Sequence, residues 1–92
     1  MNKIYEVIMQ DEYNNLYQLG FYKNLKDAVP DINDWLSLYS VSIKEDDLNE
    51  YASTFSSAFD LDIGMLFEDR DDLLGLMVRG FVLTPEHLKV QE

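Results

Sequence analysis

The spacing of apolar residues changes twice along the chain, and these two changes restrict the possible folds more than any other feature of the sequence. Apolar side chains alternate with other residues over 4–10 and again over 17–22, which is typical of half-buried strands. Over 25–39 the apolar residues follow one face of a 3.6-residue period, as in an amphipathic helix. Alternation returns over 55–63. This order of strands, helix and strands predicts an α+β fold.

The polar segment 11–15 separates the first two predicted strands and contains two adjacent asparagines. Asparagine favours turns because its side chain bonds nearby backbone groups and tolerates positive φ. Two strands joined by a short polar turn predict an antiparallel hairpin.

Pro30 determines where the predicted helix can begin, because proline lacks an amide donor and is tolerated only in the first turn. A helix capped by Asn24 would place Pro30 in its interior. We therefore expect Asp27 to be the N-cap, with residues 24–26 irregular.

The segment 41–53 remains open between two conformations. Ser42 and Glu45 have the spacing of a capping pair for a short helix, but the same residues would also suit an acidic loop. Beyond it, the strand over 55–63 is predicted to continue as far as Phe67, with Gly64 marking a bend or bulge.

The segment 73–83 has eight apolar residues among eleven. Gly75 and Gly80 disfavour a helix, so we expect a strand that is apolar on both faces. The helix would cover one face. A second copy of the chain would cover the other, which predicts a homodimer through residues 73–83.

Residues 1–92 are thus expected to form one α+β domain, with a small antiparallel sheet made of the N-terminal hairpin and the C-terminal strands, and one main helix on one face. The chain has no cysteine, so its stability must come from an apolar core. The predicted core is Tyr5, Val7, Leu19, Phe21, Val29, Ile32, Leu36, Phe55, Phe59, Leu76 and Val78.

The formal net charge of −11 is concentrated in one stretch. Residues 45–72 hold ten acidic and one basic side chain, a net charge of −9. This balance argues against direct binding to nucleic acid or to an anionic membrane. The acidic residues that we expect to contact a partner are Glu45, Asp46, Asp47, Asp60, Asp62, Glu68, Asp69, Asp71 and Asp72.

The favoured hypothesis is a non-enzymatic protein-interaction module whose acidic stretch contacts another protein, with a basic partner as one option. A second hypothesis is a nucleic-acid mimic that inhibits a DNA- or RNA-binding protein, as found among phages and mobile elements. The acidic stretch would alternatively serve solubility alone. A carboxylate-based metal enzyme is a third and unfavoured hypothesis, because neither a register that starts at Asp60 nor one that starts at Asp69 fits a calcium-binding loop.

The sequence suggests no catalytic residue, cofactor or metal ligand. Its single histidine, His87, lies after Pro85 near the C-terminal end, and its four glycines are scattered rather than gathered in a phosphate-binding loop. No apolar stretch matches a signal peptide or a membrane-spanning helix. A cytoplasmic location is therefore expected.

Overall fold

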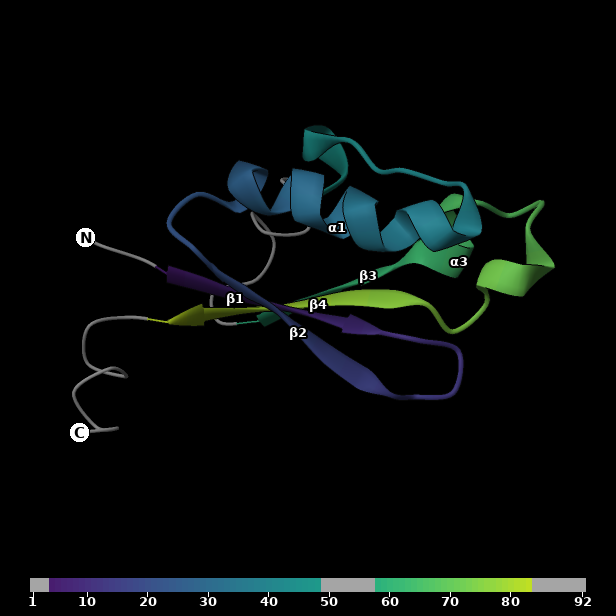
Figure 1. Cartoon of the computed structure of the whole chain (residues 1–92), viewed down its shortest axis with the longest axis horizontal. Coiled ribbons are helices and arrows are strands. Elements are labelled where there is room, and N and C mark those ends of the chain that lie inside the picture. The colour runs from purple at the N-terminus through teal and green to yellow at the C-terminus, as the bar shows by residue number, and fades with distance from the viewer. Residues whose placement is uncertain (1–3, 49–57, 84–92) are drawn as a thin grey trace.

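The computed structural model describes residues 4–48 and 58–83. Four strands form one sheet: β1 (Ile4–Gln10), β2 (Leu16–Tyr22), β3 (Ala58–Asp62) and β4 (Met77–Leu83). Their order is β2-β1-β4-β3, and every neighbouring pair is antiparallel. The main helix α1 (Val29–Leu36) lies across one face of this sheet (Figure 1). The predicted α+β architecture is confirmed.

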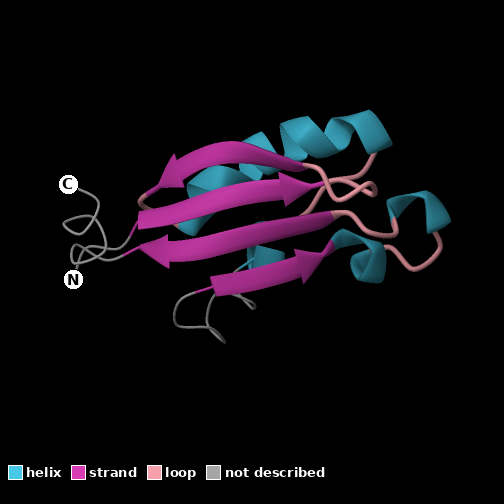
Figure 2. Ribbon diagram, turned by 90° about the horizontal axis from the view of Figure 1, so that it is seen from below, coloured by secondary structure: helices cyan, strands magenta, loops and turns pink. Residues whose placement is uncertain are grey.

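Shorter helical elements complete the fold. The 3₁₀ turns η1 (Leu25–Ala28) and η2 (Ser37–Tyr39) extend α1 at its two ends. Residues 45–48 are helical, α3 (Ile63–Leu66) follows β3, and η3 (Asp71–Leu73) precedes β4. Viewed from its other side, the sheet has no described helix in front of it (Figure 2).

The core lies between α1 and the sheet. Six of the predicted core residues are buried there, and Tyr5, Leu19 and Val29 pack against it while partly exposed. Phe55 lies outside the described residues. The buried hydrophobic residues of this cluster are Val7, Met9, Leu25, Ala28, Ile32, Leu36, Ile43, Leu48, Phe59, Leu61, Ile63, Leu73, Leu76 and Val78.

Pro30 lies in the first turn of α1, as predicted, but the cap differs from the prediction. The N-cap is Ala28 and no side chain caps the helix. The turn η1 replaces the expected irregular segment, and within it the Asp27 N–H donates to the Asn24 carbonyl oxygen at 3.0 Å. The prediction that Asp27 is the cap is wrong, because Asp27 is already inside that 3₁₀ turn.

The prediction that Phe21 belongs to the core is also wrong, and a β-bulge explains why. Val7 lies opposite Gly20 but Ile8 lies opposite Gln18, so Leu19 is an extra residue in β2. The extra residue reverses the alternation of side chains along the strand. Tyr22 therefore packs against the core, whereas Phe21 is 58% exposed.

Within the segment 41–53, residues 45–48 are helical, residues 41–44 are not, and residues 49–53 lie outside the described residues. The Asn33 side chain fixes the start of this segment by two hydrogen bonds with the backbone of Ile43. It donates to the Ile43 carbonyl oxygen at 3.1 Å and accepts from the Ile43 N–H at 2.8 Å. The Lys44 N–H donates to the Asp47 carboxylate at 2.8 Å. Asp47 thus caps this turn in place of the suggested Ser42–Glu45 pair.

The two C-terminal strands pair as predicted, but both are shorter than expected. Residues 63–66 form a helix instead of continuing β3, and β4 begins at Met77 rather than at residue 73. Gly75 has a φ of 91°, in the left-handed region, so the backbone turns here before the strand begins.

β4 is a central strand, with β1 on one side and β3 on the other. Val78, Gly80 and Val82 are buried, whereas Met77, Arg79, Phe81 and Leu83 alternate with them and are half-buried. One face of β4 is therefore buried in the core, and the other face has no helix over it among the described residues. No helix within the described segments is long and apolar enough to cross a membrane.

Candidate functional site

Several of the acidic residues predicted to contact a partner have partners within the chain. Asp47 accepts the helix-capping bond described above. Asp60 accepts from Arg79 Nε at 3.0 Å, across the β3–β4 pair. The Asp72 carboxylate accepts one hydrogen bond from Arg70 Nε at 2.9 Å and another from Arg70 Nη2 at 2.8 Å. These three carboxylates contribute to the fold, whatever else they do.

Arg70 connects the acidic turn to the end of the main helix. Its Nη2 also donates to the carbonyl oxygen of Tyr39 at 2.9 Å. The hydrogen bond to Asp72 raises the pKa of the Arg70 guanidinium, and the same bond lowers the pKa of the Asp72 carboxyl. The ion pair is solvent-accessible on both sides, so its main effect is to position the turn rather than to add much stability.

The predicted acidic surface is divided in space. Residues 45–47 lie on the same side of the sheet as α1 but near β3, Asp60 and Asp62 lie on β3, and residues 68–72 form a turn at one end of the molecule (Figures 1 and 2). Glu45, Asp46, Glu68, Asp69 and Asp71 are exposed, and Asp62 is half-buried where α3 begins. No group of three or more potential metal ligands occurs in residues 4–48 and 58–83.

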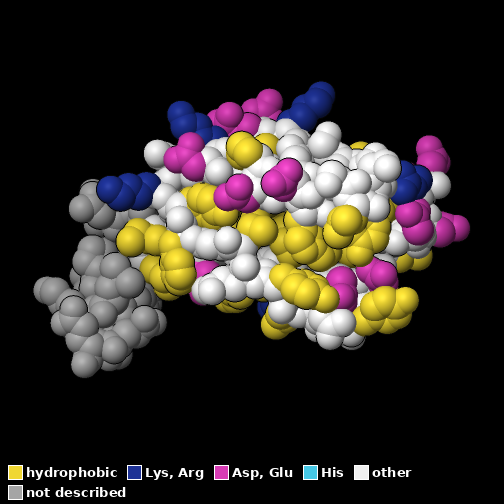
Figure 3. All heavy atoms as spheres, viewed as in Figure 1, with side chains coloured by type: hydrophobic (Ala, Val, Ile, Leu, Met, Phe, Trp, Pro, Cys, Tyr) yellow, Lys and Arg dark blue, Asp and Glu magenta, His cyan; other side chains and the backbone are white. Residues whose placement is uncertain are grey.

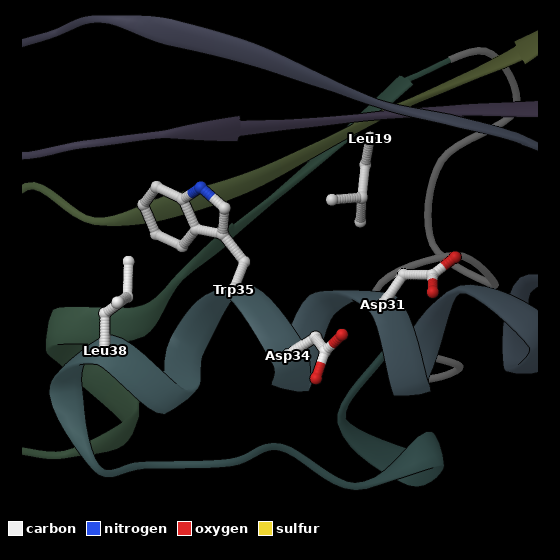
Figure 4. Close-up of a pocket in the computed structure, with 5 residues that line it drawn as sticks. All are labelled: Leu19, Asp31, Asp34, Trp35 and Leu38. Carbon is white, nitrogen blue, oxygen red and sulfur yellow. The ribbon is translucent and has the colours of Figure 1, made fainter.

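A groove lies between α1 and β2, and the sequence did not predict it. Leu19 enters it from the sheet, and Trp35 and Leu38 approach from the helix (Figure 4). Asp31 and Asp34 stand on the helix side. The groove is open and has a volume of about 540 Å³. Figure 3 shows hydrophobic side chains gathered in a band along it, with acidic side chains beside them.

A row of three aromatic rings crosses one end of the groove. The ring of Trp35 lies 5.9 Å from that of Tyr17 and 5.7 Å from that of Tyr39, measured between centroids. Both distances and the tilted planes fall in the favourable range for aromatic pairs. The Tyr39 hydroxyl donates to Glu12 Oε2 at 3.1 Å, and burial together with this bond raises the pKa of Tyr39.

Asp11 fixes the hairpin turn from which β2 starts. Its carboxylate accepts from the N–H groups of Tyr13 and Asn15, both at 2.9 Å, from the Asn15 side chain at 3.1 Å and from the Tyr17 hydroxyl at 3.0 Å. Burial alone would raise the pKa of Asp11, but the four hydrogen bonds outweigh it and lower that pKa. The bond to Asp11 in turn raises the pKa of Tyr17.

Tyr22 joins the other end of β2 to the helix. Its hydroxyl donates to Asp31 Oδ2 at 2.7 Å. Burial and this bond raise the pKa of Tyr22 to about 12. The two ends of β2 are thus attached to carboxylates, and the Tyr22 bond sets the orientation of Asp31 at the groove.

The sequence contained one sign of this groove. Asp31, Asp34, Trp35 and Leu38 are spaced at three to four residues and therefore share a helix face. Leu38 lies outside the apolar stripe that faces the core and is 79% exposed. The bulge that brings Leu19 opposite this face has no comparable sign in the sequence.

Comparison with protein-family models, with curated proteins and with solved structures gives no match to this chain.

Proposed function

We propose that the protein is a non-enzymatic protein-interaction module that acts in the cytoplasm and binds its partner at the groove between α1 and β2. The main supporting observation is that apolar side chains line the groove and that carboxylates lie beside them. Trp35 and the exposed Leu38 provide apolar area, and Asp31 and Asp34 provide orientation by charge. Binding hot spots commonly have this composition, with a large aromatic residue near the centre.

The open shape of the groove favours binding over catalysis. General acid–base chemistry needs a carboxyl group in an enclosed, water-poor pocket. Asp31 and Asp34 are exposed on the helix surface, where water screens their charges. The described pKa shifts belong to groups whose hydrogen bonds hold the fold together, such as Asp11 and Tyr22.

The test is capture of a partner from a lysate of the source organism, with three variants beside the natural chain. Leu38→Glu places a charge in the groove. Met65→Glu, at a residue that is 71% exposed on α3, is the matched control. The third variant combines Glu68→Gln, Asp69→Asn and Asp71→Asn. We expect a partner that is lost only with Leu38→Glu.

Two results would count against this assignment. A partner lost with the triple variant and retained with Leu38→Glu would place the contact on the acidic turn, as the sequence first suggested. A partner retained by all three variants would remove both surfaces from consideration.

The nucleic-acid mimic remains a second proposal with less support. A mimic needs closely spaced carboxylates along one surface, whereas the described acidic residues form separate groups that include Arg70 and Arg79. Its test is competition. A mimic would be displaced from its partner by duplex DNA and by rising salt, whereas a contact centred on Trp35 and Leu38 should depend weakly on salt.

We also propose that a second copy of the chain covers the sheet face opposite α1. Because both edges of β4 are paired, such a dimer would use the face of β4, with Met77, Phe81 and Leu83, and not its edge. Light scattering at tens of micromolar protein tests this, since a dimer mass is expected and a monomer mass would refute it.

A further inference from the structure

The outer edge of β2 is open to backbone pairing. β2 is the last strand of the sheet, and within residues 4–48 and 58–83 only β1 pairs with it. Natural edge strands are usually protected by charges, proline or bulges. The sequence of β2, LYQLGFY, has no charge and no proline, so the bulge at Leu19 is its one such feature. The opposite edge strand, β3, carries Asp60 and Asp62.

A strand added to this edge would extend two different surfaces. Successive side chains of a strand point to opposite faces of a sheet. On the helix side they would enter the groove beside Asp31 and Asp34, and α1 itself carries these two acids and no cation. On the other side they would lie beside Leu16 and Phe21, which are 56% and 58% exposed.

We propose that the groove binds an extended peptide segment that adds to β2, with cationic side chains facing α1 and apolar side chains facing the Leu16–Phe21 side. This rests on the proposed function, and it specifies the partner's chemistry. In such complexes, backbone hydrogen bonds give affinity and alternate side chains give specificity. Arginine suits the helix side best, because its planar group pairs with carboxylates and also stacks on an aromatic ring such as that of Trp35.

The bond between Tyr22 and Asp31 is compatible with this role. A carboxylate has about four lone-pair sites, and Tyr22 uses one oxygen, Oδ2. The remaining capacity is available to a cation, while Tyr22 holds the carboxylate at the groove. Charge complementarity therefore favours a basic segment at this groove. Acidic residues also occur in other parts of the chain.

The experiment uses a short, capped peptide of alternating arginine and valine and follows the emission of Trp35, the single tryptophan. We expect a saturable change. The double variant Asp31→Asn with Asp34→Asn should weaken binding about fivefold, the loss of two partly exposed ion pairs. The matched variant Asp69→Asn with Asp71→Asn should leave the affinity within a factor of about two. A peptide of alternating glutamate and valine should not bind.

Two further peptides test the backbone pairing directly. One carries N-methyl groups on its arginine amides and the other on its valine amides. An added strand presents alternate amides to β2, so one of the two peptides should lose about tenfold or more in affinity and the other should bind nearly as well as the parent. Equal binding of both would overturn the strand addition.

The outcomes separate this inference from the proposed function. If the arginine–valine peptide fails to bind while Leu38→Glu still abolishes partner capture, the peptide inference is wrong and the groove remains the interaction site. If the peptide binds equally well to the Asp31→Asn, Asp34→Asn variant, the charge argument is wrong. If neither the peptide nor a partner depends on the groove, both proposals fall.

Discussion

The two edge strands of the sheet, β2 and β3, differ in how much of their surface is free to bind a partner. The distribution of charge along the sequence would suggest the opposite order. β3 lies in the acidic stretch, yet Asp60 pairs with Arg79 and Phe59 packs over the neighbouring strand at Gly80. β2 has no charge, yet it borders the groove and presents exposed Leu16 and Phe21. The charged edge is committed to the fold, whereas the uncharged edge has surface to offer a partner.

The largest expected effect concerns the packing of the β3 edge. A Cβ atom at Gly80 would collide with the ring of Phe59, so Gly80→Ala should destabilise the fold by about 3 kcal/mol, as overpacking does. Gly20→Ala, on β2, is the comparison, because its Cβ would meet only the Tyr22 side chain, at 3.3 Å or more. The φ of 157° at Gly20 adds some backbone strain, so we expect a smaller loss than at Gly80 rather than none. Urea denaturation measures both. Equal losses would show that the two edges are packed alike.

A smaller effect is expected at the turn that leads into β2. Asp11→Asn should lower the urea midpoint more than Asp60→Asn does, because Asp11 is buried with four hydrogen bonds and Asp60 has one exposed ion pair. The lowered pKa of Asp11 means that its contribution is present above the ordinary value of 3.8 and is lost as pH falls below it. If the urea midpoint of Asp11→Asn fell with decreasing pH as steeply as that of the natural chain, this prediction would be wrong.

The smallest effect is expected at Tyr22, where β2 meets α1. Its pKa is raised from 10.0 to about 12, so its contribution to stability is complete below pH 10 and is lost as pH rises toward 12. Tyr22→Phe should therefore be less stable than the natural chain below pH 10 and should approach it near pH 12. If the difference in urea midpoint between Tyr22→Phe and the natural chain stayed constant across this pH range, the Tyr22–Asp31 bond would contribute nothing to stability.

The sequence predicted the elements better than it predicted their faces. Alternation and helical spacing located the hairpin, α1 and β3, because burial of one face imposes those periods. The apolar run with its two glycines located β4. The bulge at Leu19 reversed the faces of β2, and that change moved Phe21 out of the core and created one wall of the groove. A bulge depends on how two strands pair, so the sequence of one strand alone does not reveal it.

The acidic stretch shows the same limit for the candidate site. Its charge density is visible in the sequence, but its division among the helical turn at 45–48, β3 and the turn at 68–72 depends on tertiary structure. Asp60 gains Arg79 from the neighbouring strand, a pairing that depends on the sheet, whereas Asp72 pairs with Arg70, two residues away in the sequence. Asp31 and Asp34 share a helix face with Leu38 in the sequence, but only the structure places Leu19 beside them.

Mapping of backbone amide shifts by NMR, with the captured partner or the arginine–valine peptide added, would locate the binding surface residue by residue. We expect the shifts to concentrate on Leu16–Tyr22 of β2 and on residues 31–38, with little change at 45–47, on β3 and at 68–72. Shifts concentrated on those acidic segments, with β2 and the helix unchanged, would contradict this expectation.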